Sequence, residues 1–344
     1  EDYPRRMREL GGTGTGPPNP RRNLQLMITR RCQLRCAYCP VVKADRDMPA
    51  EIVDQSVDLL LTARAPRVRL DLTGGEALLR ADLVRRAVAR LAAGAARAGK
   101  QTDLYMVSNG MRIDPPMARW LADAGFEIEL SLDGPEDVHN RWKLPLETGV
   151  NPYGATREAI ERVLSAGGRH RVVMVATPET VDRLPASFAH VAGLGVAKID
   201  VNYAIGRRWL GAPLHAYLAA LRQIVSDHGP ALREGRLHLG NLGSRSEPSV
   251  LNAEWMVDVD GSIHLMPEWA LESSRPAGDP EEPWGQVSRA GRWDDLHAGR
   301  FHAYLTLLRT YAWRDPSLRA TLLDNVLTGR EVARGLPSVR RENP

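Results

Sequence analysis

The chain has 344 residues, of which 43% are hydrophobic and 26% charged, so it can form a full-sized core and is neither disordered nor fibrous. Its 46 lysine and arginine residues nearly balance 42 aspartate and glutamate residues and are scattered among them, which argues against nucleic acid as a partner. No apolar run approaches the ~20 residues that span a bilayer, and the charged start is unlike a signal peptide, so we expect a soluble cytoplasmic protein without membrane association.

Residues 1–23 are predicted to form a flexible N-terminal segment, because the glycines and prolines of residues 11–20 disfavour both helix and strand. From Leu24 onward, short β-rich runs alternate with long amphipathic stretches, a pattern typical of parallel strands joined by crossover helices. The predicted strands are residues 24–28, 68–72, 103–107, 127–132, 171–176 and 198–202. The predicted helices are residues 50–64, 82–98, 116–124, 155–166, 184–192 and 214–227. This order predicts an α/β fold with a partial (β/α)6 TIM-like barrel over residues 24–235.

Residues 236–344 are predicted to form a small C-terminal α+β extension. Residues 255–260 and 263–266 flank Gly261 and predict a hairpin with an Asp-Gly turn. Helical patterns follow at residues 293–308 and 317–334. We interpret the tryptophans of this extension as its core rather than as the lining of a pocket.

The chain has three cysteines, Cys32, Cys36 and Cys39, all on the loop that follows the first predicted strand. This odd and clustered set excludes a disulfide scaffold and favours metal or nucleophile chemistry. The loop stands at the carboxyl end of a barrel strand, where barrel active sites are built. Three thiolates at this spacing can hold one iron–sulfur cluster and leave one iron open. Structural zinc is the alternative, but it needs a fourth ligand, and the nearest histidine in sequence is His139.

The Cys-x3-Cys-x2-Cys spacing, with Tyr38 before the last cysteine, resembles the cluster-binding loop of the radical S-adenosylmethionine (SAM) enzymes. Four further segments match this family in order, and they are residues 73–80, 108–110, 131–135 and 139–141. The resemblance covers residues 24–235. It implies a radical SAM core that binds SAM and one [4Fe-4S] cluster, the latter through Cys32, Cys36 and Cys39.

The resemblance also implies a set of SAM contacts. The residues of this set are Tyr38, Gly74, Gly75, Glu76, Ser108, Asn109, Ser131, Asp133 and Arg141. Glu76 can accept hydrogen bonds from the methionine amino group, and the Arg141 guanidinium suits a carboxylate. Ser131 and Asp133 share one face of a strand end and would contact the ribose or methionine part. The alternative interpretation is that these residues cap loops and form turns.

The family implies a reductive mechanism. An external electron donor of the flavodoxin or ferredoxin type reduces the cluster, SAM is cleaved, and a 5′-deoxyadenosyl radical removes hydrogen from the substrate. The cofactor carries this chemistry, so the protein's task is to place the reactants and exclude water.

Residues 258–266 resemble the start of a SPASM or twitch extension, where a cysteine is expected near Met266. Because no cysteine lies outside the loop, we expect neither an auxiliary cluster nor a thiol that returns hydrogen to the substrate. The candidate catalytic residues are Tyr203, at the end of the sixth strand, and His264 and Glu268, near the missing cysteine. For His264 and Glu268, a solvated surface position is the alternative.

These observations favour a radical SAM enzyme of natural-product biosynthesis that acts on an amino-acid-bearing or sugar-like precursor. A maturase of a ribosomally made peptide is the alternative, and the short segment before Leu24 leaves no room there for a leader-binding domain. A non-enzymatic zinc or interaction module is the alternative from a different class. We expect a small-molecule or peptide substrate.

Overall fold

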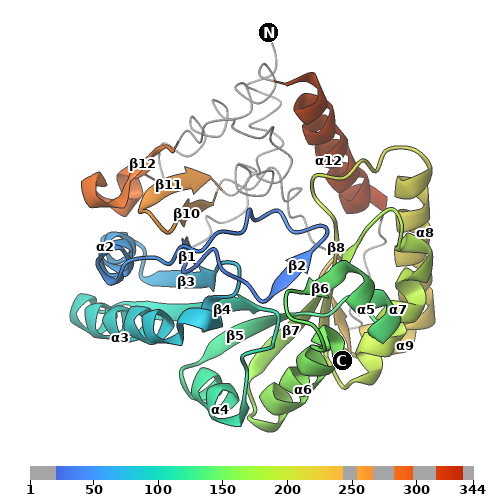
Figure 1. Cartoon of the computed structure of the whole chain (residues 1–344), viewed down its shortest axis with the longest axis horizontal. Coiled ribbons are helices and arrows are strands. Elements are labelled where there is room, and N and C mark those ends of the chain that lie inside the picture. Colours follow the sequence, from blue (N-terminus) through green and yellow to red (C-terminus); the bar gives the residue numbers. More distant parts are fainter. Residues whose placement is uncertain (1–20, 243–253, 266–282, 297–314, 336–344) are drawn as a thin grey trace.

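The fold is a curved, mostly parallel β-sheet with helices around its outside (Figure 1). The computed structural model describes residues 21–242, 254–265, 283–296 and 315–335. The barrel strands are β1 (Arg21–Met27), β3 (Arg67–Thr73), β4 (Gln101–Ser108), β5 (Phe126–Ser131), β7 (Arg169–Ala176) and β8 (Lys198–Tyr203). The covering helices are α2 (Ala50–Leu61), α3 (Ala81–Ala98), α4 (Pro115–Asp123), α6 (Pro152–Ser165), α7 (Leu184–Gly193) and α8 (Ala212–Asp227). The predicted α/β fold with a partial barrel is confirmed.

The sheet runs in the order β12-β11-β10-β1-β3-β4-β5-β7-β8-β9. All pairs from β10 to β9 are parallel, so the carboxyl ends of the barrel strands open on one side. Capping residues and prolines fix helix starts. At α4, the Asp114 side chain accepts a hydrogen bond from Met117 N–H, and two prolines begin the helix. The remaining elements are β2 (Leu34–Cys36), η1 (Ala77–Arg80), α5 (Glu136–Trp142), β6 (Lys143–Pro145), η2 (Val181–Arg183), α9 (Gly229–Arg233), β9 (His238–Leu239), β12 (Gly285–Gln286) and η5 (Val287–Arg289).

The two faces of the barrel sheet differ in chemistry. Side chains alternate along each strand, and in β3 the apolar residues Leu70 and Leu72 are fully buried under the helices. The intervening Arg69 and Asp71 point to the inside of the barrel and line a cavity there. Parallel sheets covered on both faces are usually apolar throughout, so this polar inner face marks a binding space rather than a second core.

The C-terminal part of the chain continues the barrel sheet. The predicted hairpin is present as β10 (Trp255–Val257) and β11 (Ser262–Leu265), and β10 pairs in parallel with β1. The predicted helix at residues 317–334 is α12 (Pro316–Gly335), whereas residues 297–308 lie outside the described residues. The domain boundaries at residues 23 and 235 stay a prediction.

A buried ion pair joins the segment that follows β1 to this C-terminal part. The Arg30 guanidinium donates hydrogen bonds to both Asp258 carboxylate oxygens, at 3.1 and 3.2 Å from Nε. The two side chains are only 7% and 2% exposed. Because a buried charge is costly without its partner, this ion pair ties the entrance of the cysteine loop to the turn after β10.

Helix α12 holds the loop that follows β8, residues 204–211. Asp324 is 2% exposed, and it accepts hydrogen bonds from Trp209 N–H at 2.7 Å and Leu210 N–H at 3.0 Å. The Asn325 amide oxygen accepts a hydrogen bond from Gly206 N–H at 2.8 Å. The loop in turn reaches the cysteines, because the Arg207 guanidinium donates to Ala37 O at 3.0 Å.

Asp324→Ala should loosen the loop after β8. The change leaves two loop N–H groups without an acceptor, so we expect a loss of about 2–4 kcal/mol of local stability. Hydrogen exchange at residues 206–210 should become faster. Glu331→Ala removes an exposed carboxylate from the same helix and is the control. Hydrogen exchange at residues 206–210 should be unchanged in this variant. Equal protection of the loop in both variants would contradict the role given to Asp324.

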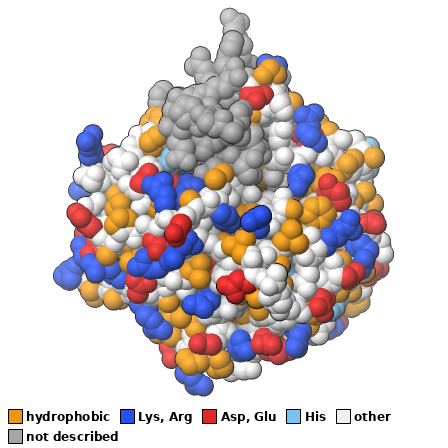
Figure 2. Space-filling view, viewed as in Figure 1, with side chains coloured by type: hydrophobic (Ala, Val, Ile, Leu, Met, Phe, Trp, Pro, Cys, Tyr) orange, Lys and Arg blue, Asp and Glu red, His pale blue; other side chains and the backbone are white. Residues whose placement is uncertain are grey.

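Basic and acidic side chains are interspersed over the face seen in Figure 2, rather than gathered into a patch of one sign. Within the described ranges, none of the helices has the length and apolar character needed to cross a bilayer.

Candidate active site

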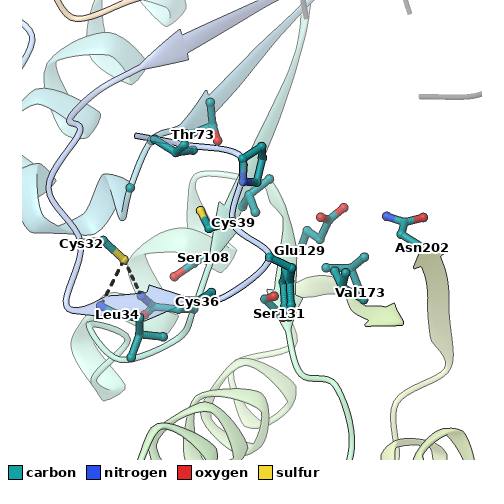
Figure 3. Close-up of a pocket in the computed structure, with 18 of the residues that line it drawn as sticks. Cys32, Leu34, Cys36, Cys39, Thr73, Ser108, Glu129, Ser131, Val173 and Asn202 are labelled. Carbon is teal, nitrogen blue, oxygen red and sulfur yellow. Dashed lines mark hydrogen bonds between the residues drawn. The ribbon is translucent and has the colours of Figure 1, made fainter. Parts of the chain in front are cut away.

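A cavity of about 450 Å³ lies inside the barrel near the carboxyl ends of the strands (Figure 3). Its volume is typical of a small-molecule site. The sequence-predicted residues that line it are Cys32, Cys36, Tyr38, Cys39, Gly74, Gly75, Ser108, Asn109, Ser131 and Tyr203. Four other predicted residues, Glu76, Asp133, Arg141 and His264, do not line it. Glu268 lies outside the described residues.

Hydrogen-bond donors or cations lie beside each of the three sulfur atoms. Cys32 Sγ accepts from Leu34 N–H at 3.4 Å and from the Asn109 amide at 3.7 Å. Cys39 Sγ lies 3.2 Å from Lys43 Nζ. Cys36 lies in β2, directly opposite Lys143 of β6. Donors and cations beside the sulfurs stabilise thiolates, so this donor set fits an iron–sulfur cluster held by three cysteines.

The thiols are free and partly buried. Burial raises the pKa of Cys36 to about 12, and it also raises the pKa of Cys32. A cluster binds thiolates, so its binding must displace these protons. Across the described residues, no group of three or more His, Cys, Asp or Glu side chains is arranged to hold a single metal ion.

The paired glycines let the end of β3 approach the chain that enters the cysteine loop. Gly75 N–H donates to Thr29 O at 2.7 Å, and Glu76 N–H donates to Arg31 O at 2.9 Å. A Cβ atom on Gly75 would lie 2.1 Å from Arg31 O. The glycines therefore place the β3 end against the loop that carries the thiols, in addition to lining the cavity.

Glu76 is 1% exposed and connects two strand ends. Its carboxylate accepts from Asn109 N–H at 2.8 Å, from Ser108 Oγ at 3.0 Å and from Leu78 N–H at 3.2 Å. Burial raises the pKa of Glu76, and these three donors oppose that shift. The carboxylate thus fixes the ends of β3 and β4. Its predicted contact with the SAM amino group stays a prediction.

The buried cation at the end of α5 is Lys143, whereas the sequence pattern indicates Arg141. Lys143 is 2% exposed and lines the cavity, and its ammonium donates to Ser131 O at 3.2 Å and to Ser131 Oγ. It lies 3.7 Å from Asp133, whose carboxylate accepts from the Tyr38 hydroxyl and from Val175 N–H. Arg141 is exposed on α5 with its guanidinium over the Trp142 ring. Lysine is scarce in this chain, and that scarcity is the signal that could have singled out Lys143.

Lys143→Met should lower the free energy of unfolding by about 3 kcal/mol, because it leaves the Asp133 carboxylate buried without its cation. Urea denaturation of the purified chain measures this change. Lys198→Met, which removes a half-exposed ammonium, is the matched control and should change stability by less than about 0.5 kcal/mol. Similar losses in both variants would mean that the Lys143 ion pair is dispensable.

Among the candidate catalytic residues, only Tyr203 reaches the cavity within the described part of the chain. Its hydroxyl donates to Asn325 O at 3.0 Å, and burial raises its pKa. His264 is 5% exposed, and its Nε2 lies 2.7 Å from Ser262 Oγ in β11. Catalytic roles for these residues stay predictions.

Three cysteines and a glycine pair lie around one cavity. A comparison of the sequence with models of known families points to the same region of the chain. Residues 26–190 match the family model described as the radical SAM superfamily. The chain belongs to the radical SAM superfamily. Membership implies a [4Fe-4S] cluster and SAM as cofactors, and it agrees with the three cysteines in Cys-x3-Cys-x2-Cys spacing.

Named relatives of this radical SAM protein are enzymes. It is 27% identical over 181 residues to pre-heme d1 synthase of Dinoroseobacter shibae, a match that covers 52% of this chain and 42% of that protein. It is 26% identical over 198 residues to PqqA peptide cyclase of Gluconobacter oxydans, covering 54% and 50%. The matched region thus spans half or less of these relatives.

The solved structure of native anSMEcpe with bound AdoMet has a similar fold. The TM-score is 0.72 at 16% identity, and the match covers 91% of this radical SAM protein and 97% of that chain. At this level of identity the likeness concerns the fold. It extends over nearly the whole chain, beyond the barrel itself.

Proposed function

We propose that this chain is an enzyme that cleaves SAM reductively and removes a hydrogen atom from an amino-acid-bearing or sugar-like precursor in natural-product biosynthesis. One observation carries the proposal. The three cysteines and the glycine pair line a single cavity that also extends along the polar inner face of the barrel. The cavity therefore offers cofactor and substrate a shared space.

A bound cluster would supply the electron for reductive cleavage of SAM into methionine and a 5′-deoxyadenosyl radical. Cys32, Cys36 and Cys39 would hold it. The buried Lys143 fixes the Ser131 hydroxyl at the cavity wall. The barrel walls and the start of the loop after β8, Ala204 and Ile205, line the cavity and would shield bound reactants from part of the solvent. The electron would come from a flavodoxin- or ferredoxin-type donor.

A ribosomal peptide is the second candidate substrate. The sequence likeness to PqqA peptide cyclase supports it, as does the fold likeness to native anSMEcpe with bound AdoMet and Cp18Cys peptide. The likeness to pre-heme d1 synthase and the modest cavity volume support a small molecule. We give the small molecule priority, because the inner face that borders the cavity is densely polar.

Anaerobic reconstitution with iron and sulfide tests the proposed function. We expect a broad visible absorbance near 400 nm, typical of such clusters, and release of 5′-deoxyadenosine from SAM after addition of dithionite. The same protein without iron and sulfide is the control. A purified chain that retains zinc and never cleaves SAM under these conditions would favour the non-enzymatic alternative instead.

A further inference from the structure

The cavity has a second end, away from the cysteines. We call it the polar floor and define it by Arg69, Asp71, Tyr105 and Glu129, all of which line the cavity. Asp71 and Glu129 each stand two residues before the end of their strand, which places them about 7 Å deeper in the barrel than the strand ends. None of these residues was singled out by the sequence, since each lies inside a strand and outside the matching motifs.

The guanidinium groups around the polar floor are already occupied by carboxylates. Arg69 donates to both carboxylate oxygens of Asp71 and covers the Tyr105 ring at 4.2 Å. Arg171, the neighbour of Glu129 on β7, pairs instead with Glu127 at 2.6 Å and with Asp200 at 2.8 Å. Each guanidinium is therefore matched by at least one carboxylate.

Glu129 differs from Asp71 in its hydrogen-bond partner. Its carboxylate accepts a hydrogen bond from the Tyr105 hydroxyl, and among the described residues it forms no ion pair. Burial raises its pKa, and Asp71 beside Arg69 has a pKa raised to about 7 by the same cause. Arg69 and Arg171 only partly offset the cost of placing the Glu129 charge in the cavity wall, because they pair with other carboxylates, and a cationic ligand would offset it further.

The charges of the cavity are ordered along its length. Lys43 lies beside Cys39 and Lys143 lies opposite Cys36. Glu129 and Asn202 lie on the side of the cavity away from the thiols (Figure 3). The lysines do not attract the positive end of an elongated ligand, whereas Glu129 does, since Arg69 at the polar floor is paired with Asp71. The cavity thus sets a direction for such a ligand, with its cationic end far from the thiols.

We propose that the polar floor binds a positively charged nitrogen group of the substrate, an ammonium or a guanidinium, through the Glu129 carboxylate, with the Asn202 amide oxygen as a further acceptor. This inference rests on the proposed function, and it narrows the substrate class to amines and guanidines. The part of the substrate toward the cysteine end is then the part exposed to hydrogen removal.

Three probes of equal chain length test the proposal, namely n-butylammonium, butanol and butyrate. Binding to the reconstituted full chain is followed by saturation-transfer NMR, which needs no turnover. We expect n-butylammonium to bind and the other two to bind at least about tenfold more weakly. Glu129→Gln, which keeps shape but removes charge, should weaken n-butylammonium about tenfold or more.

Glu161→Gln removes an exposed carboxylate of α6 and is the matched control, with unchanged probe affinity. Equal binding of all three probes to the unmodified chain would overturn the proposal whether or not the variants fold, and so would full affinity in a folded Glu129→Gln protein. If the chain selects n-butylammonium but never cleaves SAM, the proposed function fails and the cation site stands. If it cleaves SAM without selecting n-butylammonium, only the cation site fails.

Discussion

Cys36→Ala should abolish both the visible absorbance of the reconstituted protein and the release of 5′-deoxyadenosine. Cys36 is one of three thiols that can hold the cluster, and it lies on β2, where it is held between the loop backbone and β6. Two remaining thiolates leave a second iron without a protein ligand, so the cluster is lost rather than weakened. Iron content, absorbance and product release are the three measurements.

Arg35→Ala is the control for this experiment, because Arg35 precedes Cys36 on β2 but is exposed and stands outside the cavity lining. It should retain iron and SAM cleavage. Product release from Cys36→Ala at the rate of the unmodified chain would remove Cys36 from the ligand set.

Gly75→Ala should be the most damaging single-methyl change near the site. The added Cβ atom would stand 2.1 Å from the backbone oxygen of Arg31, and its position is set by the backbone of residue 75, so neither atom can move away without a backbone shift. Either β3 or the cysteine loop must shift, at a cost of about 3 kcal/mol in the free energy of unfolding. We also expect most of the cluster absorbance to be lost, since the loop leaves its position.

Gly193→Ala serves as the matched control, because a Cβ atom at Gly193 meets no other atom within 4 Å. It should leave stability and cluster loading unchanged. A Gly75→Ala protein with the denaturation midpoint and absorbance of the unmodified chain would show that the close approach of β3 to the loop has no consequence.

The regular part of the fold was predictable from the sequence, because short β-rich runs alternate with long amphipathic stretches along the chain. The motif residues at strand ends were predictable as well, since parallel strands bring their carboxyl ends together. The β2–β6 pairing was missed, because strands of three residues show no periodicity and their partners lie more than a hundred residues apart.

The buried groups of the site were harder to anticipate. Arg141 and Lys143 are two residues apart, and only the turn at the end of α5 decides that Lys143 enters the cavity while Arg141 faces solvent. Glu129 shows no local signal either, because its importance depends on Arg171 being taken by Glu127 and Asp200 on neighbouring strands. Charge balance of this kind is a property of the assembled sheet.

The position of β1 has a consequence for the order of events during synthesis. β1 leads directly to the cysteines, yet one of its two neighbours is β10, and the Arg30–Asp258 pair joins residues 228 positions apart. A ribosome working at about 5–20 residues per second needs roughly 10–50 s to bridge such a separation. For that time the nascent sheet has an open edge beside the thiols. The β1 edge beside the cysteine loop is therefore paired only after residues 255–258 have been made.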